Sequence, residues 1–437
     1  MSENLGQAAG VLEARLGRAP RDVIEATVVL EAWAGLPAGN AMAAARTLIQ
    51  TDTATASVPG RIDAVDPAHR QSVALESLAL ILSILSVAAW ATPLSRAFGA
   101  QTLAEAIRIA LPVAVAVQWA LRSRYLSLSS GMALLAGDGL AVVALAFLGV
   151  VAPLLLIPGC GRIAAILVAI WVGGAVVTRR GWGLLYSLAL TGAAVALDDG
   201  VDAVLVLLLL TAGVLAATFA GVISSRAETD ERPGGVSRTT LAALLGACVG
   251  VLLMADPSLG WGVRGLHPAI SLVPSVAGSL WGGYHLWNLY EAVPQGLSGV
   301  APLRASRRTM RGPAMALFLG AAARLVVATV VLSAVVIALG RWTHGTDRPS
   351  VFIAFGCVAL VSLQVSLLEA LGRQRAALMA IAAALTVELA WPHLVGSGIS
   401  GGALAAGAIV GILLTLPPLI TLLSRAGRVL ATALWIH

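Results

Sequence analysis

The sequence predicts an all-α polytopic membrane protein, with about twelve transmembrane helices in two six-helix halves and a small N-terminal cytosolic helical unit. Apolar residues make up 58% of the 437 positions and charged residues 11%, and the mean hydropathy is +0.90. A soluble chain of this length needs more charge to cover its surface. Apolar runs of about 20 residues recur, which is the length of a helix that spans a bilayer. These runs are continuous rather than alternating, which argues against a β-barrel.

Six apolar runs precede a charged loop and six follow it. Because six is even, both halves enter the membrane from the same side, as parallel repeats about an axis along the membrane normal. The expected spans are 73–94, 103–121, 133–157, 163–178, 182–197, 203–224, 239–255, 268–292, 314–339, 350–371, 376–395 and 402–423.

Arginines gather in every second loop, and this bias predicts the orientation of the chain. The arginine-rich loops are expected inside, which places both termini in the cytosol and the protein in the plasma membrane (the inner membrane of a bacterial cell). The net charge of +6 therefore reflects orientation, and no nucleic-acid partner is expected. The inside arginines are Arg122, Arg124, Arg179, Arg180, Arg226, Arg232, Arg238, Arg304, Arg307, Arg308, Arg311, Arg373, Arg375, Arg425 and Arg428.

The chain divides into segments by composition. Residues 1–50 carry the apolar spacing of short amphipathic helices, with turn signals at Pro20 and around Gly35. This unit either docks a cytosolic partner or caps the membrane region. The remaining segments are a polar linker at 51–72, a first membrane half at 73–224, a charged cytosolic loop at 225–238, a second membrane half at 239–424 and a cytosolic tail at 425–437.

The eighth expected span carries an unusual polar and aromatic stripe. Five of its residues share one side of a helix, at positions i, i+3, i+4, i+7 and i+10. Polar groups at membrane depth are costly, so the stripe is expected to face protein or water. It either lines a translocation pathway, in the cytosolic half of the membrane, or packs as a helix with an interfacial aromatic belt. Its members are Trp281, Tyr284, His285, Asn288 and Glu291.

Two charged residues are expected deep in the membrane. Arg324 lies about ten residues from the inner end of its span, which is roughly 15 Å by helical rise, and Glu388 lies about twelve residues into its own span. Their depths are expected to match closely. They form either a structural ion pair or a functional site, in which Arg324 holds an anionic substrate group and Glu388 takes part in ion coupling.

A further acidic residue, Asp138, lies between two glycines and either lines a cytosolic vestibule or marks the inner membrane boundary. No nucleotide-binding, nucleophile-elbow or zinc-protease motif is present in the sequence, so ATP-driven transport within this chain is excluded. The histidines lack metal-ligand spacing, and the three cysteines form no disulfide framework. No catalytic residue, metal or cofactor is therefore expected.

The topology, the segment PSVAGSLWGGYHLWNLYEAVPQGLSGV and the basic loop PLRASRRTMRG that follows it resemble the multidrug/oligosaccharidyl-lipid/polysaccharide (MOP) exporter superfamily. Its polysaccharide branch includes lipid-linked oligosaccharide flippases and Pel-type exopolysaccharide transporters. The resemblance covers residues 73–424 and implies export of a polysaccharide or a lipid-linked glycan through a central cavity between the halves. Arg324 would then suit a phosphate-bearing, anionic substrate.

Two other classes of function compete with transport. One is an integral membrane enzyme of cell-surface glycan assembly, a polymerase or a ligase, although such enzymes usually carry a large outside loop and every loop here is short. The other is a membrane scaffold that acts through residues 1–50.

Overall fold

In the computed structural model, every element of the described residues is helical. The prediction of an all-α membrane protein is confirmed to that extent. The structure describes residues 8–12, 15, 20, 23–52, 67–126, 134–135, 138, 147–223, 235–259, 270–283, 303–342, 349–395 and 399–423. Within these residues, nine helical stretches are long and apolar enough to cross a membrane.

One of the nine stretches, Gly161–Asp198, holds two crossings. At about 1.5 Å per residue, its 38 residues are far longer than the bilayer core is thick. The chain reverses at Gly181, whose φ of 87° is a left-handed conformation that glycine adopts without strain. The result is a hairpin of α9 (Gly161–Val177) and α10 (Gly183–Asp198), joined by the short segment η3 (Thr178–Trp182).

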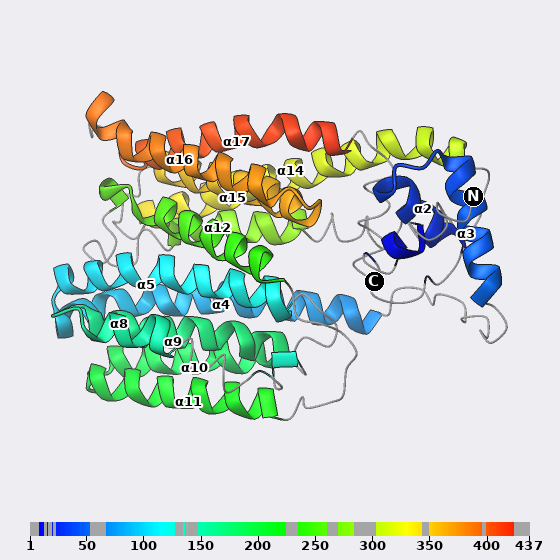
Figure 1. Cartoon of the computed structure of the whole chain (residues 1–437). Coiled ribbons are helices and arrows are strands. Elements are labelled where there is room, and N and C mark those ends of the chain that lie inside the picture. Colours follow the sequence, from blue (N-terminus) through cyan, green and yellow to red (C-terminus); the bar gives the residue numbers. More distant parts are fainter. Residues whose placement is uncertain are drawn as a thin grey trace.

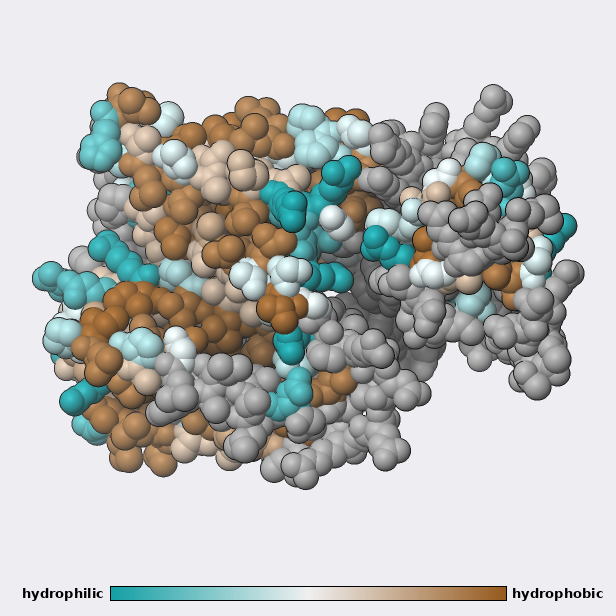
Figure 2. All heavy atoms as spheres, in the orientation of Figure 1, coloured by the Kyte–Doolittle hydropathy of each residue, from teal (hydrophilic) through white to brown (hydrophobic). Residues whose placement is uncertain are grey.

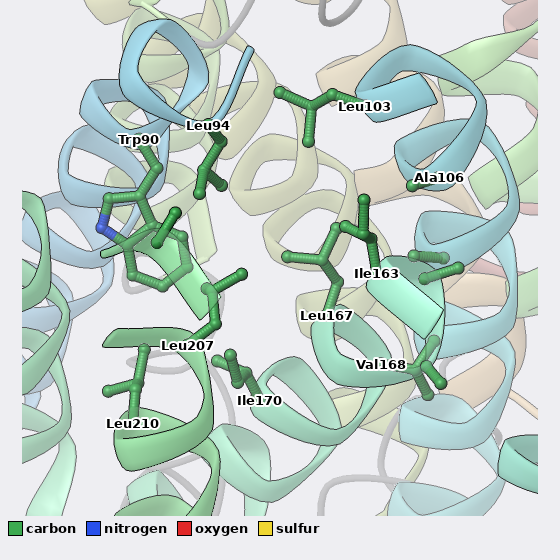
Figure 3. Close-up of a cluster of buried hydrophobic side chains, with 14 of the residues drawn as sticks. Trp90, Leu94, Leu103, Ala106, Ile163, Leu167, Val168, Ile170, Leu207 and Leu210 are labelled. Carbon is green, nitrogen blue, oxygen red and sulfur yellow. The ribbon is translucent and has the colours of Figure 1, made fainter. Parts of the chain in front are cut away.

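The first group of helices lies together in the lower part of Figure 1. It contains α4 (Pro67–Phe98), α5 (Ala100–Leu121), α9, α10 and α11 (Ala203–Ile223). The short elements η1 (Arg122–Leu126), η2 (Phe147–Val151) and α8 (Ala152–Leu155) belong to the same group. Its core is almost wholly apolar, and Figure 3 shows Trp90 and Leu94 of α4 facing Leu207 of α11 and Ile170 of α9.

The second group contains α12 (Val236–Met254), α14 (Leu303–Trp342), α15 (Pro349–Ala370), α16 (Gln374–Leu394) and α17 (Gly402–Leu423). The helix at 270–283 packs on α14, and η4 (Pro257–Leu259) follows α12. Two buried apolar clusters join these helices to one another. Ten of the twelve expected spans thus coincide with described helices. The expected spans at 133–157 and 268–292 lie partly outside the described residues, so the count of twelve and the six-helix halves stay predictions.

The two groups meet where α5 packs along α12. Two glycines of α12 permit this approach, because a Cβ atom at Gly250 would lie 2.5 Å from the Cα of Pro112, and one at Gly246 would lie 2.8 Å from the carbonyl oxygen of Val115. We call this contact, made by Gly246 and Gly250 with Pro112, Val115 and Trp119, the α5–α12 seam.

The surface of the two groups suits a lipid environment. Large apolar side chains such as Leu185 and Leu209, each 64% exposed, face outward on several helices. Figure 2 shows hydrophobic residues over the middle of the bundle and hydrophilic ones gathered towards its two ends. Exposed apolar area of this extent indicates contact with a lipid bilayer.

The first and last membrane helices share one end of the bundle: α4 begins and α17 ends on the right of Figure 1. The arginine-bearing connections after α5, α9 and α15 lie at this same end, because the helices alternate in direction. We call it the arginine-rich end. The grouping agrees with the charge bias of the sequence, while the side of the membrane on which this end lies stays a prediction.

Two helices, α2 (Val23–Trp33) and α3 (Ala38–Asp52), form the N-terminal unit. They share a small core of their own with Ala8 and Leu12. Part of the expected linker at 51–72 is helical, since α3 extends to Asp52 and α4 begins at Pro67, a residue type that is favourable in the first turn of a helix. The cytosolic location of this unit stays a prediction.

Candidate functional site

A buried carboxylate, Asp256, joins the end of α12 to the beginning of α17. Its Oδ2 accepts a hydrogen bond from the backbone N–H of Leu404 (3.2 Å), and its Oδ1 accepts from the backbone N–H of Ser258 (2.9 Å) and from the Ser258 hydroxyl. The hydroxyl of Ser258 in turn accepts from the N–H of Gly401 (2.8 Å). The first N–H groups of a helix have no partner within the helix and favour negative charge. Asp256 therefore caps α17 from another element.

Glu388 of α16 lies next to this carboxylate. Its side chain is 1% exposed, and its Cβ lies 3.0 Å from where a Cβ of Gly407 in α17 would be. Neither carboxyl oxygen has a hydrogen-bond partner among the described residues. The carboxylate of Asp256 is the neighbouring charged group that acts on it. Glu388 is thus a buried acid that faces a second acid, with no described cation beside it.

Such a carboxyl pair can bind a proton or a small monovalent cation. Two carboxylates in apolar surroundings repel each other, and a bound cation removes that repulsion. The other charged residues on the elements around Glu388 are Arg238 of α12, Glu369 of α15, and Arg375 and His393 of α16. Arg238, Glu369 and Arg375 belong to the arginine-rich end, and His393 is exposed. Asp256 is therefore the charged group that decides the electrostatics of Glu388.

Arg324 of α14 lies beside Trp281 of the helix at 270–283. The guanidinium carbon is 6.0 Å from the centroid of the Trp281 ring, and one guanidinium nitrogen donates to the carbonyl oxygen of Gly320 (3.3 Å). The two helices are closely packed, because a Cβ atom at Gly278 or Gly282 would lie within 2.7 Å of a backbone carbonyl oxygen of α14. An arginine carries five N–H donors, so the contacts with described residues leave most of the donors of Arg324 available to a ligand.

Arg324 lies on α14 and Glu388 on α16, and the described contacts of each residue do not include the other. The expectation that their depths match stays a prediction. The ion-pair alternative has no support in the described contacts.

Of the aromatic stripe, the structure describes Trp281 alone, which is 48% exposed. The other stripe residues, Tyr284, His285, Asn288 and Glu291, lie outside the described residues. Their role as a pathway wall stays a prediction.

Asp138 has a specific partner rather than only a place at a boundary. Its Oδ2 accepts a hydrogen bond from the hydroxyl of Tyr125 (2.8 Å), and this hydroxyl accepts one from Nε of Arg124 (2.8 Å). Tyr125 is 2% exposed. Sequence reasoning placed Asp138 among the candidates but did not identify Tyr125.

Sequence reasoning also missed Asp256. It missed a second buried contact too, in which the hydroxyl of Thr415 in α17 donates to the amide oxygen of Gln364 in α15. The signal for Asp256 was its position, directly before Pro257 and Ser258 at the end of an apolar run. Nothing in one sequence indicates that it meets Glu388, which is more than a hundred residues away. Within the described part of the chain, no group of three or more His, Cys, Asp or Glu residues could hold a metal ion.

Comparisons of the chain with protein-family models, with curated proteins and with solved structures find no match.

Proposed function

We propose that this protein is a plasma-membrane transporter that exports or flips a polysaccharide or a lipid-linked, anionic glycan. Transport proceeds by alternating access between the two helix groups and is coupled to a cation at Asp256 and Glu388. The proposal includes membership of the MOP exporter superfamily, in its polysaccharide branch, with both termini cytosolic.

The buried carboxyl of Glu388 is the observation that carries the proposal. Burial of an acid next to a second acid destabilises a membrane helix and adds no stabilising contact. Intramembrane acids of this kind usually mark ion or proton pathways. Asp256 has its own hydrogen bonds to η4 and α17, whereas Glu388 has none with the residues that the structure describes. Binding of a cation at Glu388 would therefore bias how α12, α16 and α17 pack together.

Arg324 supports an anionic substrate. Its guanidinium lies on a helix with exposed apolar neighbours such as Val326 and Val327, so a lipid-anchored molecule could reach it from the bilayer. Guanidinium groups bind phosphate through two parallel hydrogen bonds, and the donors of Arg324 that the described contacts leave available suit this geometry. A diphosphate that links a glycan to a lipid carrier has the matching charge.

The α5–α12 seam supports the conformational part of the proposal. It is the place where the two groups pack most closely, through Gly246 and Gly250. Rigid groups that rock against each other about such a contact are the usual way for secondary transporters to alternate access.

The function is tested with purified protein in liposomes and a fluorescent short-chain polyprenyl-diphosphate disaccharide. Dithionite quenches the label in the outer leaflet, so the slow phase of quenching measures flipping. We expect the wild-type protein to accelerate flipping and Arg324→Ala to slow it at least tenfold, because truncation of one partner in a desolvated charge pair costs about 2–5 kcal/mol.

The matched control is Arg108→Ala, which removes an exposed arginine from the membrane helix α5 and should flip at the wild-type rate. A normal rate in Arg324→Ala would contradict the substrate site. No flipping by the wild-type protein, together with unchanged surface glycans in a deletion strain, would contradict the function itself.

A further inference from the structure

Tyr125 lies at the arginine-rich end of the first helix group. It lies in η1, a π-helical turn that continues α5, and turns of this kind are frequent at functional sites. It forms a small buried cluster with Leu135 and with Val176 of α9, and Val222 of α11 packs against this cluster. A buried aromatic side chain thus lies where η1, α9, α11 and the segment of Leu135 meet.

A charged residue stands at each end of the hydrogen-bond chain through the Tyr125 hydroxyl. Arg124 donates to this hydroxyl, which donates to the carboxylate of Asp138, each over 2.8 Å. The guanidinium carbon of Arg124 also lies 5.4 Å from the centroid of the Tyr125 ring. Hydrogen bonds to ionised groups are roughly twice as strong as those between neutral groups. The opposite charges at the two ends strengthen the chain further.

The hydrogen bonds through the Tyr125 hydroxyl connect Asp138, which lies in a separate segment, to the end of α5. The backbone N–H of Asp138 donates to the carbonyl oxygen of Leu134 (3.0 Å). The same η1 turn packs against α12 of the second helix group, so these hydrogen bonds lie beside the α5–α12 seam. Loss of the bond to Asp138 would release Asp138 from a position next to the contact between the two groups.

We propose that Arg124, Tyr125 and Asp138 form a lock, which holds the arginine-rich end of the first group closed in the conformation described here and opens when the groups change their relative positions. The use of this lock in transport rests on the proposed function. The lock itself does not, because its opening exposes buried residues whether or not a substrate is moved.

The test measures exposure of a buried reporter. Val176→Cys, on α9 beside Tyr125, is introduced after the native cysteines Cys160, Cys248 and Cys357 are replaced by alanine. The protein is placed in lipid nanodiscs, where both faces are accessible, and its rate of reaction with a maleimide is followed. Tyr125→Phe keeps the ring and removes the hydroxyl, and we expect it to raise the labelling rate about tenfold, in line with the loss of hydrogen bonds to charged groups.

The matched control is Tyr186→Phe, which removes another largely buried hydroxyl of the same group. That hydroxyl donates to the carbonyl oxygen of Ile170 (3.2 Å), so this variant should label as slowly as the parent. Asp138→Ala should raise the labelling rate as much as Tyr125→Phe. The double variant should label no faster than either single variant, because both substitutions interrupt the same chain of hydrogen bonds. Equal rates for Tyr125→Phe and Tyr186→Phe, or effects that multiply in the double variant, would overturn the lock.

Discussion

The two helix groups differ in how they treat buried polar side chains. In the first group these side chains are paired: Ser86 with Thr191 (2.9 Å), and Trp90 Nε1 with the carbonyl oxygen of Leu190 (3.1 Å). The exception among its described residues is Ser123, in η1. In the second group, Glu388 and the hydroxyls of Ser275, Thr329 and Ser333 are buried with no hydrogen-bond partner in the described part of the chain.

This difference indicates that the two helix groups have different roles. Buried polar groups in folded proteins nearly always have partners, so those without one point to strain, to an unseen ligand or to function. The first group is a packed scaffold whose polar contacts hold its helices together. The second group retains polar atoms at a cost in stability, and it also holds Arg324. We therefore expect substitutions to affect mainly stability in the first group and mainly transport in the second.

The largest expected effect is that of Glu388→Leu. The substitution replaces a buried acid with an apolar side chain of similar volume, so it should abolish transport and raise the free energy of unfolding by about 1–3 kcal/mol. Flipping and thermal unfolding of the same purified protein measure the two quantities. The control is Glu105→Leu, at an exposed glutamate of α5, which should change neither by much. A destabilised Glu388→Leu protein would show that the acid has a structural role.

The next effect concerns the α5–α12 seam. Gly250→Ala would place a Cβ atom 2.5 Å from the Cα of Pro112, and overpacking of this kind typically costs about 1–3 kcal/mol. Gly192→Ala in α10 meets no atom within 4 Å and should instead stabilise its helix by about 0.5–1 kcal/mol. Thermal unfolding compares the two variants. Equal melting temperatures would contradict the close contact between the groups.

The smallest expected effect is on the stability of variants that each lose one hydroxyl, one variant from each group. Thr191→Val in α10 removes a hydroxyl that is bonded to Ser86 and to the carbonyl oxygen of Ser187, and hydrogen bonds between membrane helices average about 0.6 kcal/mol. Thr329→Val in α14 removes a buried hydroxyl without a described partner and should be neutral or slightly stabilising. If chemical unfolding shows that Thr329→Val is the more destabilising of the two, the contrast between the groups is wrong.

Much of the fold could be predicted from the sequence because hydropathy decides it. Ten expected spans match described helices, most of them to within a few residues, since a membrane helix must satisfy its backbone within itself and carry an apolar surface. Helix starts were less predictable: α14 begins at Leu303, eleven residues before the expected span, because the helix continues through a polar stretch.

The candidate site was less predictable, for a physical reason. Arg324, Glu388 and Asp138 stood out because a charge in an apolar run is rare and expensive. Their partners did not stand out: Tyr125 lies next to loop arginines, and Asp256 lies at a helix end, where an acid is ordinary. Which residues meet depends on how helices distant in sequence pack, and one sequence carries no record of that packing.

The central claim is that transport is coupled to a cation at Glu388. Measuring ion-driven flipping by the Glu388→Gln variant tests this claim most directly. The substitution keeps the size of the side chain and removes its ability to bind a proton or a cation as a carboxylate. Liposomes with wild-type protein, Glu388→Gln or the exposed control Glu105→Gln are given, in separate arms, a proton gradient or a sodium gradient. We predict that one gradient accelerates flipping in the wild-type and control proteins at least tenfold and leaves Glu388→Gln unaffected. Equal acceleration of Glu388→Gln would contradict ion coupling at this carboxyl.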